Sequence, residues 1–161
     1  MNKSGYAAPR APEASEFSQV RVALVATRWN VDIVDALLDG ARRCLAEWGV
    51  SAQQIVEVRA PGAYEVPLAV SLLAQQGQVD GAVTLGAVIR GDTPHFDFVA
   101  GECARGLMDV QLQHRFPVGF GVLTVNTVEQ AQERAGPGPD NKGYEAAAAM
   151  LEMIRLARIC A

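Results

Sequence analysis

The segment from Gly86 to Asp97 holds the residues that are best suited to chemistry in this chain. It joins an apolar stretch, 81–89, to Arg90-Gly91 and then to a predicted helix start that contains His95. The free N–H groups at the start of a helix favour an anion such as phosphate. The positive end of the helix dipole favours the neutral imidazole, which accepts a proton. This segment therefore predicts an anion cradle and a proton-transfer group on one short turn.

A short polar side chain is expected to cap this helix. Asp92 and Thr93 can both accept hydrogen bonds from free helix N–H groups, and Pro94 suits the first turn. The apolar residues that follow at helical spacing are Phe96, Val99, Cys103, Leu107 and Val110. Gly86 and Gly91 give a superficial likeness to a P-loop, but Asp92 stands where that loop needs a lysine. A single phosphate near Thr93 is therefore expected, not a triphosphate.

Two other loops carry groups suited to a flat, polar ligand. Trp29 follows the first apolar stretch, where it is either a packing aromatic or a flat platform at a binding site. Gly62 permits close approach of the backbone to a ligand. Glu65 either stabilises a helix start or accepts hydrogen bonds from a polyol or an amide. A structural role stays open for both side chains beside the role in binding.

Two cations near the end of the chain are candidates for phosphate binding. Arg134 suits bidentate capture of a phosphate, although a positive charge at the end of a helix also explains it. Lys142 also fits a solvated loop, and His114 fits a surface position. The chain has no Gly-x-Ser-x-Gly, Gly-x-Gly-x-x-Gly, His-x-x-x-His or clustered cysteines. Hydrolase, dinucleotide-binding and metal-site interpretations therefore have no support.

The elements that must position these residues alternate between strand and helix. Apolar runs predict strands at 20–26, 54–58, 81–89 and 118–125. Helical spacing and glycine boundaries predict helices at 33–48, 66–76, from Pro94 to about 115, 128–135 and 143–157. This alternation indicates a doubly wound α/β domain with a parallel sheet and helices on both faces. Ligands bind beyond the carboxyl ends of such strands, at the loops that start with Thr27, Arg59, Arg90 and Asn126.

Composition narrows the class of protein further. The chain has 161 residues, of which 50% are hydrophobic, and a net charge of −4, which gives no electrostatic reason to expect nucleic acid or an anionic membrane as partner. Residues 1–18 are expected to form a flexible N-terminal arm, and 19–161 a single domain. The three separated cysteines favour a reducing cytosol. With no signal peptide and no long apolar run, a cytoplasmic location is expected.

Six segments together resemble the 6,7-dimethyl-8-ribityllumazine synthase family. They are Trp29-Asn30, 61–67, 86–99, 120–124, 129–136 and 141–147. The resemblance covers nearly everything after residue 20, and several motifs in the right order make it specific. It implies a flavodoxin-like three-layer α/β/α sandwich with a four-stranded parallel sheet.

The same resemblance implies a transferase of riboflavin biosynthesis. Its reaction condenses 5-amino-6-(D-ribitylamino)uracil with 3,4-dihydroxy-2-butanone 4-phosphate to give 6,7-dimethyl-8-ribityllumazine, phosphate and water. No metal and no redox cofactor are implied. Two alternatives stay open: a non-catalytic flavin-binding or shell-forming relative, and a mononucleotide-binding regulator that forms a monomer or dimer.

By resemblance, the pyrimidine and its ribityl chain bind in the first three loops. Trp29 would stack on the pyrimidine ring. The ribityl chain and the ring edge would be held by Ala63, Tyr64 and Glu65, and backbone contacts would come from Ala87, Val88 and Ile89. The family often has phenylalanine at the positions of Trp29 and Tyr64, so we expect a changed pocket shape rather than lost activity.

By the same resemblance, a second group of residues handles the phosphate and the protons. Asp92 and Thr93 would meet the phosphate, Arg134 would be its charged clamp, and Lys142 a supporting cation. His95 would be the proton shuttle. A carboxylate that faces a phosphate costs electrostatic energy, so Asp92 is expected to point its side chain away or to cap the helix.

Phe120 carries the expectation about assembly. It lies near the start of the strand 118–125, about 13 to 17 Å from the carboxyl end at about 3.3 Å per residue. It is therefore at the wrong edge of the sheet to join the other candidates of its own chain. The resemblance implies pentamers, or multiples of them, in which a neighbour donates Phe120, Arg134 and Lys142. The short turn 136–140 favours a shell only weakly.

Overall fold

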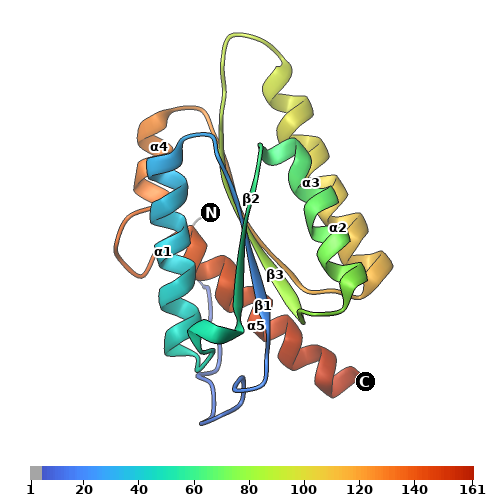
Figure 1. The fold of residues 1–161 in the computed structure, drawn as a ribbon. Helices are drawn as coiled ribbons and strands as arrows, with labels where there is room; N and C mark the ends of the chain where they lie inside the picture. The colour runs from blue at the N-terminus through green and yellow to red at the C-terminus, as the bar shows by residue number, and fades with distance from the viewer. Residues whose placement is uncertain (1–4) are drawn as a thin grey trace.

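The computed structural model describes residues 5–161, which form a parallel sheet between two layers of helices (Figure 1). The four strands are β1 (Val22–Thr27), β2 (Ile55–Ala60), β3 (Gly81–Ile89) and β4 (Val118–Val125). Their order is β2-β1-β3-β4, and all three neighbouring pairs are parallel. The expected flavodoxin-like α/β/α sandwich with a four-stranded parallel sheet is confirmed.

The helices divide between the two faces of the sheet (Figure 1). One face carries α1 (Val31–Glu47), α4 (Val128–Arg134) and α5 (Lys142–Cys160), and the other carries α2 (Val66–Gln76) and α3 (His95–His114). Short 3-10 turns, η1 (Ala52–Gln54) and η2 (Ala63–Glu65), flank β2. Successive residues of a strand point to opposite faces, so each face receives its own apolar core.

The contact between α1 and α5 brings two backbones together. A Cβ atom on Gly143 would lie 1.9 Å from the carbonyl oxygen of Leu37, so only glycine fits there. The buried side chain of Asn141 caps α5, because its oxygen accepts hydrogen bonds from two N–H groups of the first turn. Its Nδ2 atom donates to the carbonyl oxygens of Ala36 and Gly136. The motif Asn141-Lys142-Gly143 thus fixes where α5 begins.

Most predicted boundaries are close to the observed ones. The ranges 66–76, 81–89 and 118–125 agree with α2, β3 and β4, whereas β1, β2 and α5 differ from their predicted ranges by up to three residues at an end. The predicted cap of α3 is wrong. Pro94 is the residue before the helix, and no side chain caps it in the usual way. The nearest contact is from the His95 N–H to the Thr93 hydroxyl oxygen, at 3.4 Å.

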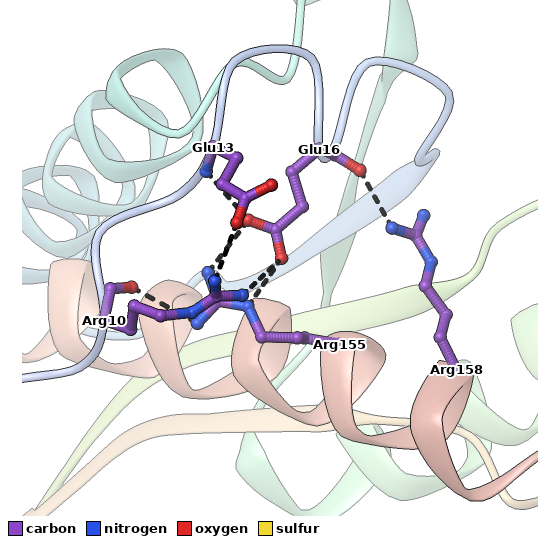
Figure 2. A network of polar contacts seen from close by, with 5 residues as sticks. All are labelled: Arg10, Glu13, Glu16, Arg155 and Arg158. Carbon is purple, nitrogen blue, oxygen red and sulfur yellow. Dashed lines mark hydrogen bonds and ion pairs between the residues drawn. The ribbon is translucent and has the colours of Figure 1, made fainter.

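The end of the expected arm packs against α5 (Figure 2). The Glu16 carboxylate accepts hydrogen bonds from Arg155 at 2.6 and 3.1 Å, and the Glu16 carbonyl oxygen accepts one from Arg158 at 2.8 Å. Phe17 is fully buried, with its ring centroid 5.8 Å from that of Trp48. The packed part of the chain therefore begins upstream of residue 19, while residues 1–4 of the arm lie outside the described residues.

Candidate active site

A cavity of about 660 Å³ opens at the carboxyl ends of β1 and β3. After β1 the chain continues to β2 on one side of this pair, and after β3 it continues to β4 on the other side. The loops that follow β1 and β3 therefore diverge and leave a crevice between them. The cavity is lined by Thr27, Trp29, Asn30, Gly62, Ala63, Tyr64, Glu65, Ala87, Val88, Ile89, Gly91, Thr93, His95, Phe96, Phe98 and Val99. Most of the candidates predicted from the sequence therefore meet in one place.

Exposed aromatic rings line this cavity: Phe98, which is 69% exposed, comes from α3, and two others come from the loops after β1 and β2. Trp29 is 71% exposed and Tyr64 is 62% exposed, so neither ring is used to fill the core of the chain. The interpretation of Trp29 as a packing aromatic is therefore wrong within one chain. A Cβ atom on Gly62 would lie 3.3 Å from Cδ1 of Trp29, so this glycine lets the second loop pass close to the ring. Flat rings in this position are stacking surfaces for a heterocycle.

The turn η2 presents Ala63, Tyr64 and Glu65 to the cavity. The Glu65 N–H donates a hydrogen bond to the Gly62 carbonyl oxygen at 3.2 Å, which closes the turn. Glu65 directly precedes α2, so its carboxylate stands both at a helix start and in the cavity wall. Both interpretations of this side chain fit its position.

The end of β3 offers an unpaired edge of backbone. The pairing of β3 with β1 ends at Leu85, whereas its pairing with β4 continues to Ile89. Ala87, Val88 and Ile89 therefore have no strand partner on the β1 side, where they line the cavity. Backbone N–H and C=O groups without a strand partner seek other hydrogen-bond partners, so this edge can bind a polar ligand.

Asn30 was missed among the predicted binding residues. Its backbone is left-handed, at φ 53° and ψ 53°, and it precedes α1. Its Nδ2 atom donates a hydrogen bond to the Ala87 carbonyl oxygen at 3.1 Å, which joins the loop after β1 to the end of β3. Asparagine tolerates the left-handed conformation better than most residues, and this preference was the available signal in the sequence.

His95 and Thr93 lie where the loop after β3 enters α3. His95 is the first residue of the helix, and both side chains line the cavity. Asp92 is exposed and lies outside the cavity lining. His95 and Thr93 at the start of α3 therefore lie at the same cavity, which suits proton transfer beside an anion.

Phe96 has a different role from the predicted one. It falls on the same helical face as the buried residues Ala100 and Cys103, yet it is only half-buried and lines the cavity. The reason is that α3 begins beyond the end of the sheet, so its first turn meets the cavity instead of the core (Figure 1). Helical spacing predicts the face but not the point at which the sheet ends.

Besides Asp92, three predicted residues do not reach the cavity of their own chain. Arg134 donates a hydrogen bond to the Gln130 carbonyl oxygen at 2.9 Å, within its own helix. Lys142 forms an ion pair with Glu145 at 2.7 Å, at the start of α5. Phe120 is half-exposed on the edge strand β4. One chain therefore supplies the rings, the backbone edge and the imidazole, but not these two cations.

The two buried cysteines, Cys44 and Cys103, are poorly suited to act as nucleophiles. Burial raises the pKa of Cys44 to about 12 and that of Cys103 to about 11, so both thiols stay protonated at neutral pH. Over residues 5–161, no group of three or more His, Cys, Asp or Glu side chains is placed to hold a metal ion. In that same part of the chain, no helix combines the length and the apolar character needed to cross a membrane.

An open crevice at the switch point of a parallel sheet, with stacking rings at its mouth, places the chain among flavodoxin-like α/β proteins that bind a small molecule. A sequence model of the family described as 6,7-dimethyl-8-ribityllumazine synthase matches residues 19–158. A 6,7-dimethyl-8-ribityllumazine synthase of Desulfovibrio desulfuricans is 53% identical over 137 residues, which cover 85% of this chain and 88% of that protein. The chain belongs to the 6,7-dimethyl-8-ribityllumazine synthase family.

Proposed function

We propose that this chain catalyses the condensation of 5-amino-6-(D-ribitylamino)uracil with 3,4-dihydroxy-2-butanone 4-phosphate. The products are 6,7-dimethyl-8-ribityllumazine, phosphate and water, in riboflavin biosynthesis. The observation that carries the proposal is that the imidazole of His95 lines the same cavity as the exposed rings of Trp29 and Tyr64. A family member with this arrangement has a stacking surface and a proton carrier at one site.

The pyrimidine substrate occupies the side of the cavity nearest β1 and β2. Trp29 stacks on its ring, and the backbone of Ala87, Val88 and Ile89 meets the polar ring edge. The ribityl chain lies along η2, where the Glu65 carboxylate accepts hydrogen bonds from its hydroxyl groups. Backbone groups and one carboxylate thus provide the directional contacts that stacking alone lacks.

The phosphorylated substrate occupies the side nearest α3. The N–H groups of the first turn and the Thr93 hydroxyl group donate to the phosphate. The amine of the pyrimidine attacks the ketone and water leaves, giving an imine. Phosphate is then eliminated, and the second ring closes when the ribitylamino nitrogen adds to the remaining carbonyl and a second water leaves. Each of these steps moves a proton, and His95 accepts and returns it. Proximity of the two substrates supplies a further part of the rate.

The active protein is a pentamer, or a multiple of pentamers, in the cytoplasm. In this assembly a neighbouring chain donates Phe120, Arg134 and Lys142 to the cavity. Apolar side chains that are left exposed on one chain support association, and they include Leu68, Leu72, Met108, Leu112 and Phe120. The three free cysteines agree with a reducing compartment.

The condensation assay tests the proposal directly. The purified chain is mixed with both substrates, and lumazine absorbance and phosphate release are followed together. Equal amounts of both products are expected. Tight binding of riboflavin without any phosphate release would replace this proposal with a non-catalytic flavin-binding function.

A further inference from the structure

Arg90 joins three elements around the phosphate side of the cavity. It directly follows β3, and its N–H donates a hydrogen bond to the carbonyl oxygen of Val125, the last residue of β4, at 2.9 Å. Its Nε atom donates to Oδ1 of Asn126 at 3.2 Å, and its Nη2 atom donates to Oδ1 of Asp97 in α3 at 3.1 Å. Its guanidinium carbon lies 4.2 Å from the centroid of the Phe96 ring. One side chain therefore holds the first turn of α3 against the end of β4.

The loop beside Arg90 has little else to fix it. Segment 91–95 is exposed throughout, and a Cβ atom on Gly91 would meet nothing within 4 Å. Among residues 5–161, the hydrogen bonds of 91–94 stay within the loop and the first turn of α3, from His95 N–H to Thr93 and from Asp97 N–H to Pro94. The contacts of Arg90 are thus the ones that attach this loop to the rest of the sheet.

Arg90 does not act as a ligand in this arrangement. Gly91, Thr93, His95 and Phe96 line the cavity, but Arg90 does not. Its charge is already paired with Asp97. A planar guanidinium can donate along its edge while its face stacks on a ring, which the ammonium group of lysine cannot do in the same way.

We infer that Arg90 is a positioning residue, which holds Thr93 and His95 at the cavity through Phe96, Asp97 and Asn126. This inference rests on the proposed function for its kinetic consequence. Because the pyrimidine contacts lie on β3 and the first two loops, displacement of the α3 turn affects the phosphorylated substrate and turnover more than pyrimidine binding.

The test compares Arg90→Lys with Arg42→Lys. Arg42 serves as the control, because its guanidinium is also held by an ion pair to a carboxylate, is similarly exposed, and lies outside the cavity lining. We expect Arg90→Lys to lower kcat/KM for the butanone phosphate by about 10-fold to 100-fold, as misplacement of reacting groups does. The KM for the pyrimidine and every constant of Arg42→Lys should change by less than about twofold.

A second measurement does not depend on activity. Amide hydrogen exchange of 91–97 in the whole assembly should become about 10-fold faster in Arg90→Lys and in Asn126→Ala, and stay unchanged in Arg42→Lys. Unchanged exchange in Arg90→Lys, or an equal loss for both substrates, would overturn the positioning role. A wild-type protein that forms no lumazine while exchange still responds would overturn the proposed function instead and leave the positioning role standing.

Discussion

His95 is one of only two histidines in the chain, and both lie on α3. His95 begins the helix at the cavity, and His114 ends the same helix far from it. This pair gives the proton-transfer role a comparison within a single element. If activity falls when His95 is replaced but not when His114 is replaced, the effect belongs to the position at the cavity and indicates a role in the chemistry.

We expect His95→Asn to lower kcat by about 100-fold, which lies in the usual range for removal of a general acid or base. Both KM values should stay within about threefold, because the cavity and its ligating groups remain. Steady-state kinetics with each substrate varied in turn measures this. His114→Asn serves as the control and should behave as wild type. Unchanged turnover in His95→Asn would remove the imidazole from the mechanism.

Arg134 is expected to act on the phosphate of the site in the neighbouring chain. Because charge-assisted hydrogen bonds contribute about 1.5 to 3 kcal/mol, Arg134→Ala should raise the KM for the butanone phosphate by about 10-fold or more. The KM for the pyrimidine should stay nearly constant. Separate saturation curves for the two substrates decide the matter, since equal weakening of both contradicts a phosphate clamp.

At the scale of elements, the clamp between the N-terminal segment and α5 links stability to pH. The hydrogen bond from Arg155 lowers the pKa of Glu16 from 4.5 to about 2 (Figure 2). A depressed pKa in the folded state means that this stabilisation is fully present above about pH 4.5 and is lost as the pH falls towards 2. The contact between Glu16 and Arg155 therefore stabilises the folded protein at neutral pH, and its loss contributes to the loss of stability in acid.

We expect Glu16→Gln to lower the free energy of unfolding by about 1 to 2 kcal/mol at pH 7, because an ionised hydrogen-bond partner is removed. Near pH 2 the difference from wild type should be small. Urea unfolding across this pH range measures the difference. Glu13→Gln is the matched control, since the Glu13 side chain is 75% exposed and, within residues 5–161, forms an ion pair with the exposed Arg10 side chain. A pH-independent effect of Glu16→Gln would contradict the clamp.

The contact between α1 and α5 makes a second prediction at this scale. Gly143→Ala would place a methyl group 1.9 Å from a backbone carbonyl oxygen, so the two helices must separate. We expect a loss of about 3 kcal/mol or more, at the upper end for overpacking. Gly101→Ala on the exposed side of α3 is the control, because nothing lies within 4 Å of the added atom. Thermal or urea unfolding compares the two variants.

The elements were largely predictable, whereas their ends and attachments were less so. The apolar runs at 81–89 and 118–125 predict β3 and β4 because buried parallel strands are continuously apolar. The prediction of the α3 cap failed because Asp92 and Thr93, which are adjacent in the sequence, both match the pattern of a helix cap. Phe17 was missed because one aromatic in a polar segment carries no periodic signal. The partner that buries it, Trp48, is fixed only by the tertiary fold.

The candidate site was predictable to the extent that one chain forms it. Loops that follow parallel strands meet at one edge of the sheet, which brought Trp29, Glu65 and His95 together. Asn30 and Arg90 were missed because their contacts cross the fold, from Asn30 to Ala87 and from Arg90 to Asn126, and one sequence does not show such contacts. No pattern in a single sequence predicts whether a side chain from another part of the fold, such as Arg134, reaches the cavity.

At the scale of the whole molecule, assembly is the remaining prediction. Sedimentation of the purified protein should give the mass of five chains or a multiple of it, because exposed leucines on α2 and α3 favour association. Leu112→Glu, at a position that is 73% exposed in one chain, should shift the protein to smaller species. A wild-type monomer or dimer would exclude the pentamer, and an unchanged mass in Leu112→Glu would place the contact elsewhere.

The placement of Arg134 and His95 in separate parts of one chain has a genetic consequence. If each site takes its imidazole from one chain and its guanidinium from the next, two impaired variants can rescue each other. In a mixed ring of His95→Asn and Arg134→Ala subunits, some sites have both groups intact. These are the sites where an Arg134→Ala subunit supplies the imidazole and a neighbouring His95→Asn subunit supplies the guanidinium. Cells that carry both defective alleles would then regain part of the flux that neither allele supports alone.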